Sequence, residues 1–195
     1  SYIGIGKLGS GAKMQGLSER GGKKKQSAGG VTLSMHQPWA SLLVMGIKRI
    51  EGRSWPTDHR GRLWIHAASH EPTADEISEV EQHYRFIYEE LEGVEVRFPD
   101  CYPTSCLLGC VDVVGCITQE ELQASDLSES LKSESSSEFC FLCENPQKLL
   151  LPFVLSGQHK LWNLDSSSLR SAKQGIMPSE DSPSKTSFPR SMHSS

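Results

Sequence analysis

Apolar and polar positions follow two different periods along the chain, and both occur between about residues 31 and 164. Residues 31–35 and 62–68 combine alternation with β-branched or aromatic side chains, which is typical of strands. A longer apolar run at 106–118 predicts a buried strand, and its two interior glycines predict bulges or tight bends. Further strands are predicted at 47–54, 138–145 and 159–164.

Two segments instead show the period of a helix. Residues 38–45 begin with proline, which suits a first helical position, and are followed by Gly46, which suits a helix end. The second helix is predicted over 73–91, because Thr73 and Glu76 form a capping box ahead of one apolar stripe. That stripe comprises Ile77, Val80, Tyr84, Ile87, Tyr88 and Leu91.

The order of these elements favours an α+β fold. Five or six strands with two early helices predict a small closed or nearly closed β-barrel whose openings are covered by the flanking helices. Because the helices fall between strands in the sequence, an α/β sheet stays open as an alternative.

Composition limits the folded part of the chain. Hydrophobic residues make up 36% of the 195 positions, which is low for a fully folded protein. Residues 1–30 are rich in Gly, Lys and Ser and predict a flexible basic linker, and 166–195 are rich in Ser, Pro and Lys and predict a disordered tail. One domain is therefore expected over 31–165, with a polar surface loop at 125–138.

The net charge of −4 hides a strong segregation of charge. Residues 1–30 carry six basic residues against one acid, and 48–62 carry five against two. In contrast, 71–92 carry eight acids against one arginine. Because local charge sets the local potential, the basic segments make an anionic partner plausible despite the acidic total.

The sequence contains six cysteines and no run of 18 apolar residues. No secretory signal is visible at the N-terminus, so we expect no membrane partner, reduced thiols, and a location in the nucleus and cytosol. Cys140 and Cys143 form a C-x-x-C pair, but in a strand they point to opposite faces. We therefore expect no metal site and no cofactor.

Candidate chemistry is concentrated in the pattern G-x-K-x-x-E-x-R, formed by Gly46, Lys48, Glu51 and Arg53. In a strand, Glu51 and Arg53 share a face, whereas Lys48 joins them only if it lies in the turn after Gly46 or if a bulge shifts the register. If the three converge, Arg53 offers a planar fork for a phosphate or a base edge. The alternative is a solvated strand face with weak surface ion pairs.

Residues on both sides of the motif add cations and aromatic rings, which proteins use for phosphates and for base stacking respectively. Core packing is the alternative for each tryptophan, and a buried hydrogen-bonded side chain is the alternative for His66. The candidate contacts to nucleic acid are Lys48, Arg49, Glu51, Arg53, Arg60, Arg62, His36, Gln37, Trp39, Trp55 and His66.

The segments "SMHQPWASLLVMGIKRIEGRSW" and "GRLWIHAA" resemble the ASCH domain, a relative of the PUA-like barrels. The resemblance implies a PUA-like barrel with a cleft lined by the motif between barrel and helix. Over the wider range 1–165, the chain resembles the C-terminal part of a transcriptional coactivator. It implies nucleic-acid binding within a larger, helicase-containing complex that acts in transcription and ribosome quality control.

Two other functions are weighed against a monomeric nucleic-acid-binding domain without catalysis. Small bacterial ASCH proteins that hydrolyse acetylated cytidine resemble this motif but carry Thr in place of Glu51, and a carboxylate there cannot serve as the same nucleophile. A protein-interaction role would use acids on the 73–91 helix, such as Asp75, Glu79, Glu89 and Glu90.

Overall fold

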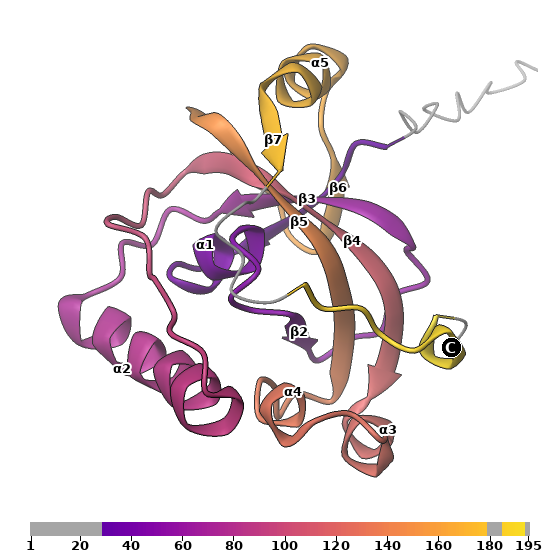
Figure 1. Cartoon of the computed structure of the whole chain (residues 1–195). Helices are drawn as coiled ribbons and strands as arrows, with labels where there is room; N and C mark the ends of the chain where they lie inside the picture. The colour runs from indigo at the N-terminus through magenta and orange to yellow at the C-terminus, as the bar shows by residue number, and fades with distance from the viewer. Residues whose placement is uncertain (1–28, 179–184, 194–195) are drawn as a thin grey trace, which may run out of the picture.

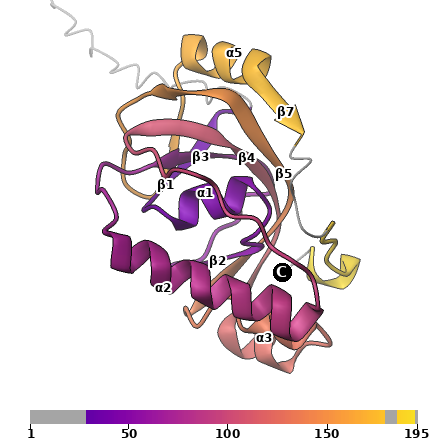
Figure 2. The ribbon, with the colours of Figure 1, turned by 60° about the vertical axis from the view of Figure 1, so that its left-hand side comes forward.

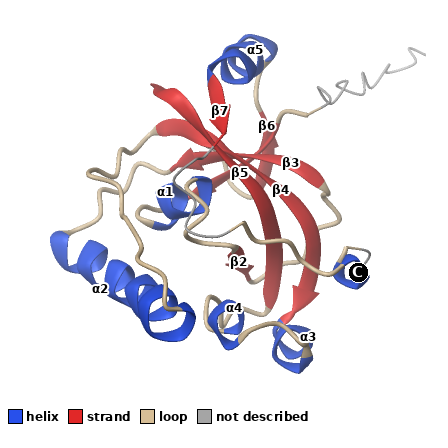
Figure 3. Ribbon diagram, viewed as in Figure 1, coloured by secondary structure: helices blue, strands red, loops and turns tan. Residues whose placement is uncertain are grey.

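The computed structural model describes residues 29–178 and 185–193, which form one curled sheet with helices around it. The sheet order is β2-β5-β4-β3-β1-β6, and β7 pairs with β5 (Figures 1 and 3). The strands are β1 (Val31–Met35), β2 (Ile50–Arg53), β3 (Gly61–Ala67), β4 (Cys106–Thr118), β5 (Phe139–Val154), β6 (Leu161–Asn163) and β7 (Ile176–Pro178).

The predicted α+β fold with a small barrel-like sheet is confirmed, and the sheet is mixed. β1 runs parallel to β3, and the other described pairs are antiparallel. The strand count exceeds the five or six expected, because β7 forms in a segment that the sequence analysis assigns to the tail. The glycine at position 109 in β4 falls beside a register shift, and a Cβ there would collide with the β5 backbone at Gln147. The bend predicted there is therefore a close approach of two strands.

The helices cover the concave side and the ends of the sheet. They are α1 (Trp39–Val44), α2 (Ala74–Arg85), α3 (Gln119–Ala124), α4 (Glu129–Lys132) and α5 (Ser166–Gly175), together with the π-helix η1 (Phe86–Glu92) and the 3-10 turn η2 (Arg190–Met192). The capping box of Thr73 and Glu76 is present, and the helical chain stops at Gly93, which has a φ of 68°. No helix in these ranges is long and apolar enough to cross a membrane.

Helix α1 forms the centre of the core because it is buried on both sides. Leu43 packs with sheet residues such as Leu63 and Phe141, while Leu42 packs with Tyr84 of α2. Figure 2 shows α1 between the sheet and α2. The buried α1 therefore fixes the position of the segment that follows it, which carries the charged motif.

The predicted disorder of the tail over 166–195 is wrong for the described residues 166–178 and 185–193. Leu169 and Ala172 of α5 are buried against the sheet, and β7 adds a strand beside β5. Residues 185–193, here called the C-terminal strap, cross the sheet, and Phe188 is 3% exposed among Ile50 and Leu142. A single buried aromatic side chain can hold a polar segment against the fold. The average composition of the segment does not reveal such a residue. The predicted linker over 1–30 lies almost wholly outside the described residues.

The predicted surface loop at 125–138 is also partly folded. It contains α4, whose N-cap Ser128 accepts a hydrogen bond from the Leu131 backbone, and it buries Leu131 and Glu134. Leu131 packs into the core, and the buried Glu134 carboxylate accepts from the Arg49 and Ile50 backbones, so an apolar and a polar contact together hold this segment.

If the strap is part of the folded core, Phe188→Ala lowers the free energy of unfolding by about 3 kcal/mol, because it leaves a cavity among buried aliphatic side chains. Phe86→Ala is the matched control, since Phe86 is 53% exposed and its loss changes stability by about 0.5 kcal/mol or less. Urea denaturation of both variants checks this. Equal, small effects of the two substitutions would show that the strap does not dock.

Candidate nucleic-acid interface

The Lys48, Glu51 and Arg53 side chains meet, and they are called the charged triad below. Lys48 Nζ lies 3.4 Å from one Glu51 carboxylate oxygen, and Arg53 Nη2 lies 2.7 Å from the other. Lys48 precedes β2 in the turn after Gly46, which has a φ of 75°, so strand alternation does not apply to it. Lys48 therefore joins Glu51 and Arg53 because it lies in the turn after Gly46, which is the first of the two arrangements that the sequence allowed.

The charged triad runs from the protein interior to the surface. Lys48 is 5% exposed and also donates from Nζ to the Ile50 carbonyl at 2.6 Å, and Glu51 is 6% exposed. Arg53 is the open end, with its side chain partly accessible. Because two cations share one carboxylate, the triad carries a net positive charge and presents it through Arg53. Loss of Glu51 would leave a buried, uncompensated cation.

Arg49 follows Lys48 directly but belongs to a separate, internal network. Its guanidinium pairs with Glu134 in the segment after α4 and, at 2.7 Å, with Glu92 of η1, and it lies 4.8 Å from the Tyr88 ring centroid. Burial by itself would lower the pKa of Arg49, but the charge of Glu134 and the hydrogen bonds to both glutamates raise it above its ordinary value. This arginine joins three elements inside the fold, and its side chain is buried.

A cavity of about 880 Å³ opens beside Arg53, and it is called the Arg53–His66 cavity. It lies where β1, β2 and β3 end, and segment 154–160 forms its far wall. The lining includes four of the predicted contacts, His36, Arg53, Trp55 and His66, together with Lys160. Two cations and three histidines line it, and no Asp or Glu is among the described residues that do. The cavity therefore favours an anionic or electron-rich ligand.

Two buried polar atoms at this cavity have no hydrogen-bond partner within the described ranges: Arg53 Nε and His66 Nδ1. His66 Nε2 lies 2.7 Å from the Leu155 carbonyl oxygen, which can only accept, so Nε2 carries the proton and Nδ1 is an acceptor. Burial lowers the pKa of His66, which keeps the ring neutral. Two residues that line the cavity thus carry one unpaired donor and one unpaired acceptor, which is unusual for buried groups.

Segment 154–160 shapes this end of the cavity closely around His66. A Cβ on Gly157 would lie 2.6 Å from His66 Nδ1 and 2.6 Å from Ser34 Oγ, so a larger residue does not fit. His66 also contacts Trp162 edge-on, at 5.9 Å between ring centroids. Sequence reasoning missed this segment, and its only signal was a glycine followed by basic residues in "SGQHK".

The aromatic and amide candidates divide between surface and core. Trp55 lines the cavity and packs edge-on against Phe141 at 5.4 Å, while Trp39 is exposed and outside the lining. Gln37 is buried and donates to Ser41 and to the Pro103 carbonyl, so it holds α1 in place. Its observed role is structural.

The remaining basic candidates lie outside the cavity lining. Arg60 donates to the backbone carbonyls of Thr57 and His59. Arg62 donates to Gln147 and lies over the Trp64 ring, with 5.9 Å to the centroid. Both side chains are partly exposed.

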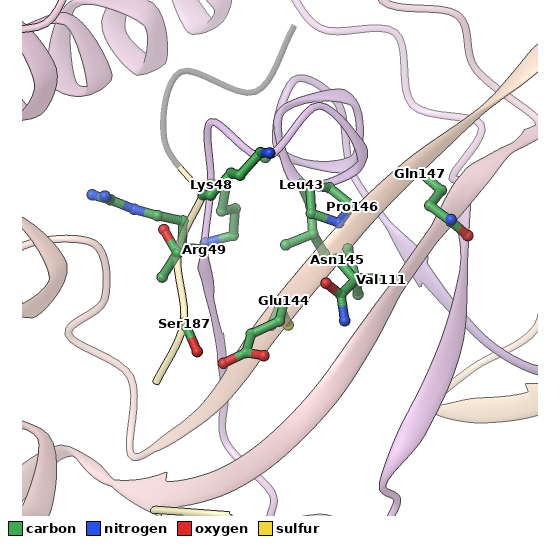
Figure 4. A pocket seen from close by; sticks show the side chains of 13 residues that line it. Leu43, Lys48, Arg49, Val111, Glu144, Asn145, Pro146, Gln147 and Ser187 are labelled. Carbon is green, nitrogen blue, oxygen red and sulfur yellow. The ribbon is translucent and has the colours of Figure 1, made fainter. Parts of the chain in front are cut away.

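A second cavity, of about 460 Å³, is lined by Lys48 of the charged triad (Figure 4). Lys48 contributes to its wall, with Leu43 from α1, Glu144 and Gln147 from β5, and Ser187 from the C-terminal strap. Figure 4 shows the Arg49 side chain pointing away from the β5 residues. The structure therefore separates Lys48 from Arg53: each lines a different cavity, and Glu51 links them.

Sequence comparison agrees with this fold and motif. The sequence profile of the ASCH domain matches residues 33–153, and the chain belongs to the ASCH domain family. It is 50% identical over 149 residues to Activating signal cointegrator 1 of Mus musculus, and 50% identical over 151 residues to Activating signal cointegrator 1 of Homo sapiens. Each match covers 76% of this chain and 25% of the relative, so the chain spans about a quarter of the relatives' length.

Among solved structures, an ASCH protein from Zymomonas mobilis is similar, with 16% identity and a TM-score of 0.44. That comparison covers 76% of this chain and 96% of the bacterial one.

Removing the shared carboxylate should destabilise the fold. Glu51→Gln keeps the side-chain shape but leaves Lys48 buried without its counter-charge, and we expect a loss of about 3 kcal/mol in the free energy of unfolding. Glu89→Gln breaks the exposed pair of Glu89 and Arg85 and should cost about 1 kcal/mol or less. Chemical denaturation measures both, and a Glu51→Gln protein as stable as the Glu89→Gln control would contradict a buried triad.

The buried, neutral His66 predicts a specific pH dependence. Its pKa in the folded protein lies below the ordinary value of 6.5, so the unfolded chain binds a proton first as the pH falls. The stability of the wild type relative to His66→Gln is thus fully present above about pH 6.5 and declines below it, until the folded-state pKa is reached. A histidine-resolved NMR titration, with denaturation at several pH values, checks the sign. A His66 midpoint above 6.5 would refute it.

Proposed function

We propose that this chain is a nucleic-acid-binding ASCH domain that holds one unstacked nucleotide of an RNA or DNA strand in the Arg53–His66 cavity. The observation that carries the proposal is the pair of unpartnered buried atoms, Arg53 Nε and His66 Nδ1, in a cavity lined by cations without acids. Buried polar groups are normally paired, so these two groups are suited to a ligand.

The two atoms also favour a base over a phosphate alone. A phosphate offers acceptors, which suit Arg53, but it does not donate to the neutral His66 Nδ1 unless it carries a proton. The edge of a nucleobase presents a donor beside an acceptor and can satisfy both. Trp55, in the same lining, supplies an aromatic surface for base contact.

The other basic candidates fit a path for the sugar–phosphate backbone. Arg60 directly precedes β3 and Arg62 is its second residue, and both are partly exposed where they can contact phosphates outside the cavity. Lys48 and Glu51 act indirectly in this proposal by holding the Arg53 guanidinium in place. Binding of this kind releases counterions and weakens as salt increases.

We propose binding without catalysis. In a hydrolase on acylated cytidine, Lys48 would serve as the base, but its Nζ donates to the Ile50 carbonyl and contacts Glu51 in the interior. Lys48 also lines a different cavity from Arg53 and His66. Release of cytidine from an acylated cytidine, lost in Lys48→Ala, would support the hydrolase instead.

The acidic surface of α2 and η1 supports an orientation on nucleic acid. Asp75, Glu79, Glu89 and Glu90 are all exposed and would be repelled by phosphates, so this face points away from the strand in our proposal. The same acids are suited to a basic protein partner. Charge reversal on α2 should therefore leave nucleic-acid affinity unchanged or slightly raised.

The cellular role follows from the relatives. Identity of 50% to part of Activating signal cointegrator 1 supports a coactivator-related role for this chain in the nucleus, within a larger protein. A cytosolic share is our further proposal. We extend the proposal to a complex that contains a helicase and acts in transcription and ribosome quality control, which the resemblance seen in the sequence implies.

Fluorescence polarisation with single-stranded and duplex RNA and DNA tests the proposal. Arg53→Ala should weaken binding to the preferred form about tenfold or more, since it removes charge-assisted hydrogen bonds. Arg53→Lys keeps the charge but not the planar fork, and should recover only part of the affinity. Arg97→Ala is the control, because Arg97 is exposed but lines neither cavity described above. Affinity that is independent of salt, or equal in Arg53→Ala and Arg97→Ala, would contradict the proposal.

A further inference from the structure

Helix α5 is fixed to the wall of the Arg53–His66 cavity by a shared apolar cluster. Leu169 and Ala172 of α5 pack with Trp162 of β6, and Leu155 of the cavity wall packs against the same cluster. Trp162 in turn contacts His66 edge-on. The outer face of α5 therefore keeps a constant position relative to the cavity.

That outer face exposes positive charge only. Arg170 and Lys173 are three residues apart on the helix, so they share a face, and both are exposed. Between residues 156 and 178 the only acid is Asp165, and its carboxylate accepts from the backbones of Ser167 and Ser168 as the N-cap of α5. Lys160, exposed in the lining of the cavity, continues the basic surface.

The charged side chains that α2, η1, α3 and α4 expose are mostly acidic instead. Figures 1 and 2 both show α5 and α2 at opposite ends of the molecule. The exposed acids of α2, η1, α3 and α4 are Asp75, Glu76, Glu79, Glu89, Glu90, Glu120, Glu121 and Glu129. A polyanion placed in the cavity is thus attracted towards α5 and repelled from the α2 end.

We propose that α5 is a second nucleic-acid contact, where Arg170 and Lys173 bind phosphates of the strand that leaves the cavity past Lys160. The inference rests on the proposed function and adds the direction of the bound strand. Continuity with a cavity suited to a nucleotide favours nucleic acid over an acidic peptide as the partner of this face.

The dimensions suit a strand of moderate length. From Lys160 to Asp165 the chain advances five residues, which is at most about 17 Å. A stacked trinucleotide covers about 10 Å, which is less than this limit, whereas a dodecanucleotide covers about 40 Å at 3.4 Å per nucleotide and exceeds it. Only the longer probe should sense α5.

The test measures the salt dependence of binding of the full chain to fluorescent oligo-uridine and oligo-thymidine, three and twelve nucleotides long. For the longer probe, Arg170→Ala/Lys173→Ala should reduce the slope of log affinity against log salt by about 1.4, the value for two phosphate contacts on a single strand. The trinucleotide should bind the double variant as well as it binds the wild type. Arg85→Ala/Arg97→Ala is the matched control, which removes the same charge near the acidic end and leaves the slope unchanged.

The outcomes separate the two proposals. An unchanged slope for the twelve-nucleotide probe in Arg170→Ala/Lys173→Ala, with Arg53→Ala still defective, overturns the α5 contact and leaves the cavity proposal standing. Loss of trinucleotide binding in the α5 variant overturns it too, because the effect then comes from the cavity wall. If the slope is unchanged but an acidic peptide binds wild type and not the α5 variant, α5 is a protein contact instead.

Discussion

The fold and the site both depend on one buried carboxylate, that of Glu51, which accepts from two cations at once. Glu51 sits in β2 opposite Phe141 of β5, where the sheet holds its backbone. Lys48 contacts one carboxylate oxygen from inside, and the other oxygen accepts from Arg53 and orients its guanidinium at the cavity. In low dielectric this arrangement is strong only while all three members are present, because each isolated charge would be costly to bury.

Lys48 and Arg49 are adjacent in the sequence, but their side chains belong to two different charge networks because the backbone turns between them. Lys48 joins the charged triad, while Arg49 points into the network of Glu92 and Glu134 that ties η1 and the α4 region to the core. Two buried networks of glutamates and cations, one around Glu51 and one around Arg49, are expected to specify a single position for the start of β2. A shift by one residue would leave both sets of charges unpaired. That fixed position is what lets Arg53 present an unpartnered Nε at the cavity.

The parts of the structure that follow from local patterns could be predicted, and those that depend on distant contacts could not. Strands, the capping box of α2 and the bend at Gly109 are encoded within a few residues of each position. Glu134 reaches Arg49 across 85 positions, and Gly157 meets His66 across a similar separation, so neither partner is visible from spacing. The burial of Phe188 could not be predicted, because the average composition of the tail around it is polar. For the site, the motif identified the triad, but only the folded structure shows that Lys48 and Arg53 line different cavities.

The central claim is that Arg53 Nε and His66 Nδ1 are both satisfied by one bound nucleotide. It is tested most directly by NMR on protein labelled with ¹⁵N in its arginine and histidine side chains, titrated with a short single-stranded oligonucleotide. The account predicts that the Arg53 Nε–H and His66 Nδ1 signals shift together and saturate at one ligand concentration. It is contradicted if both signals stay unchanged while the oligonucleotide binds elsewhere, or if inorganic phosphate alone reproduces the full change at His66.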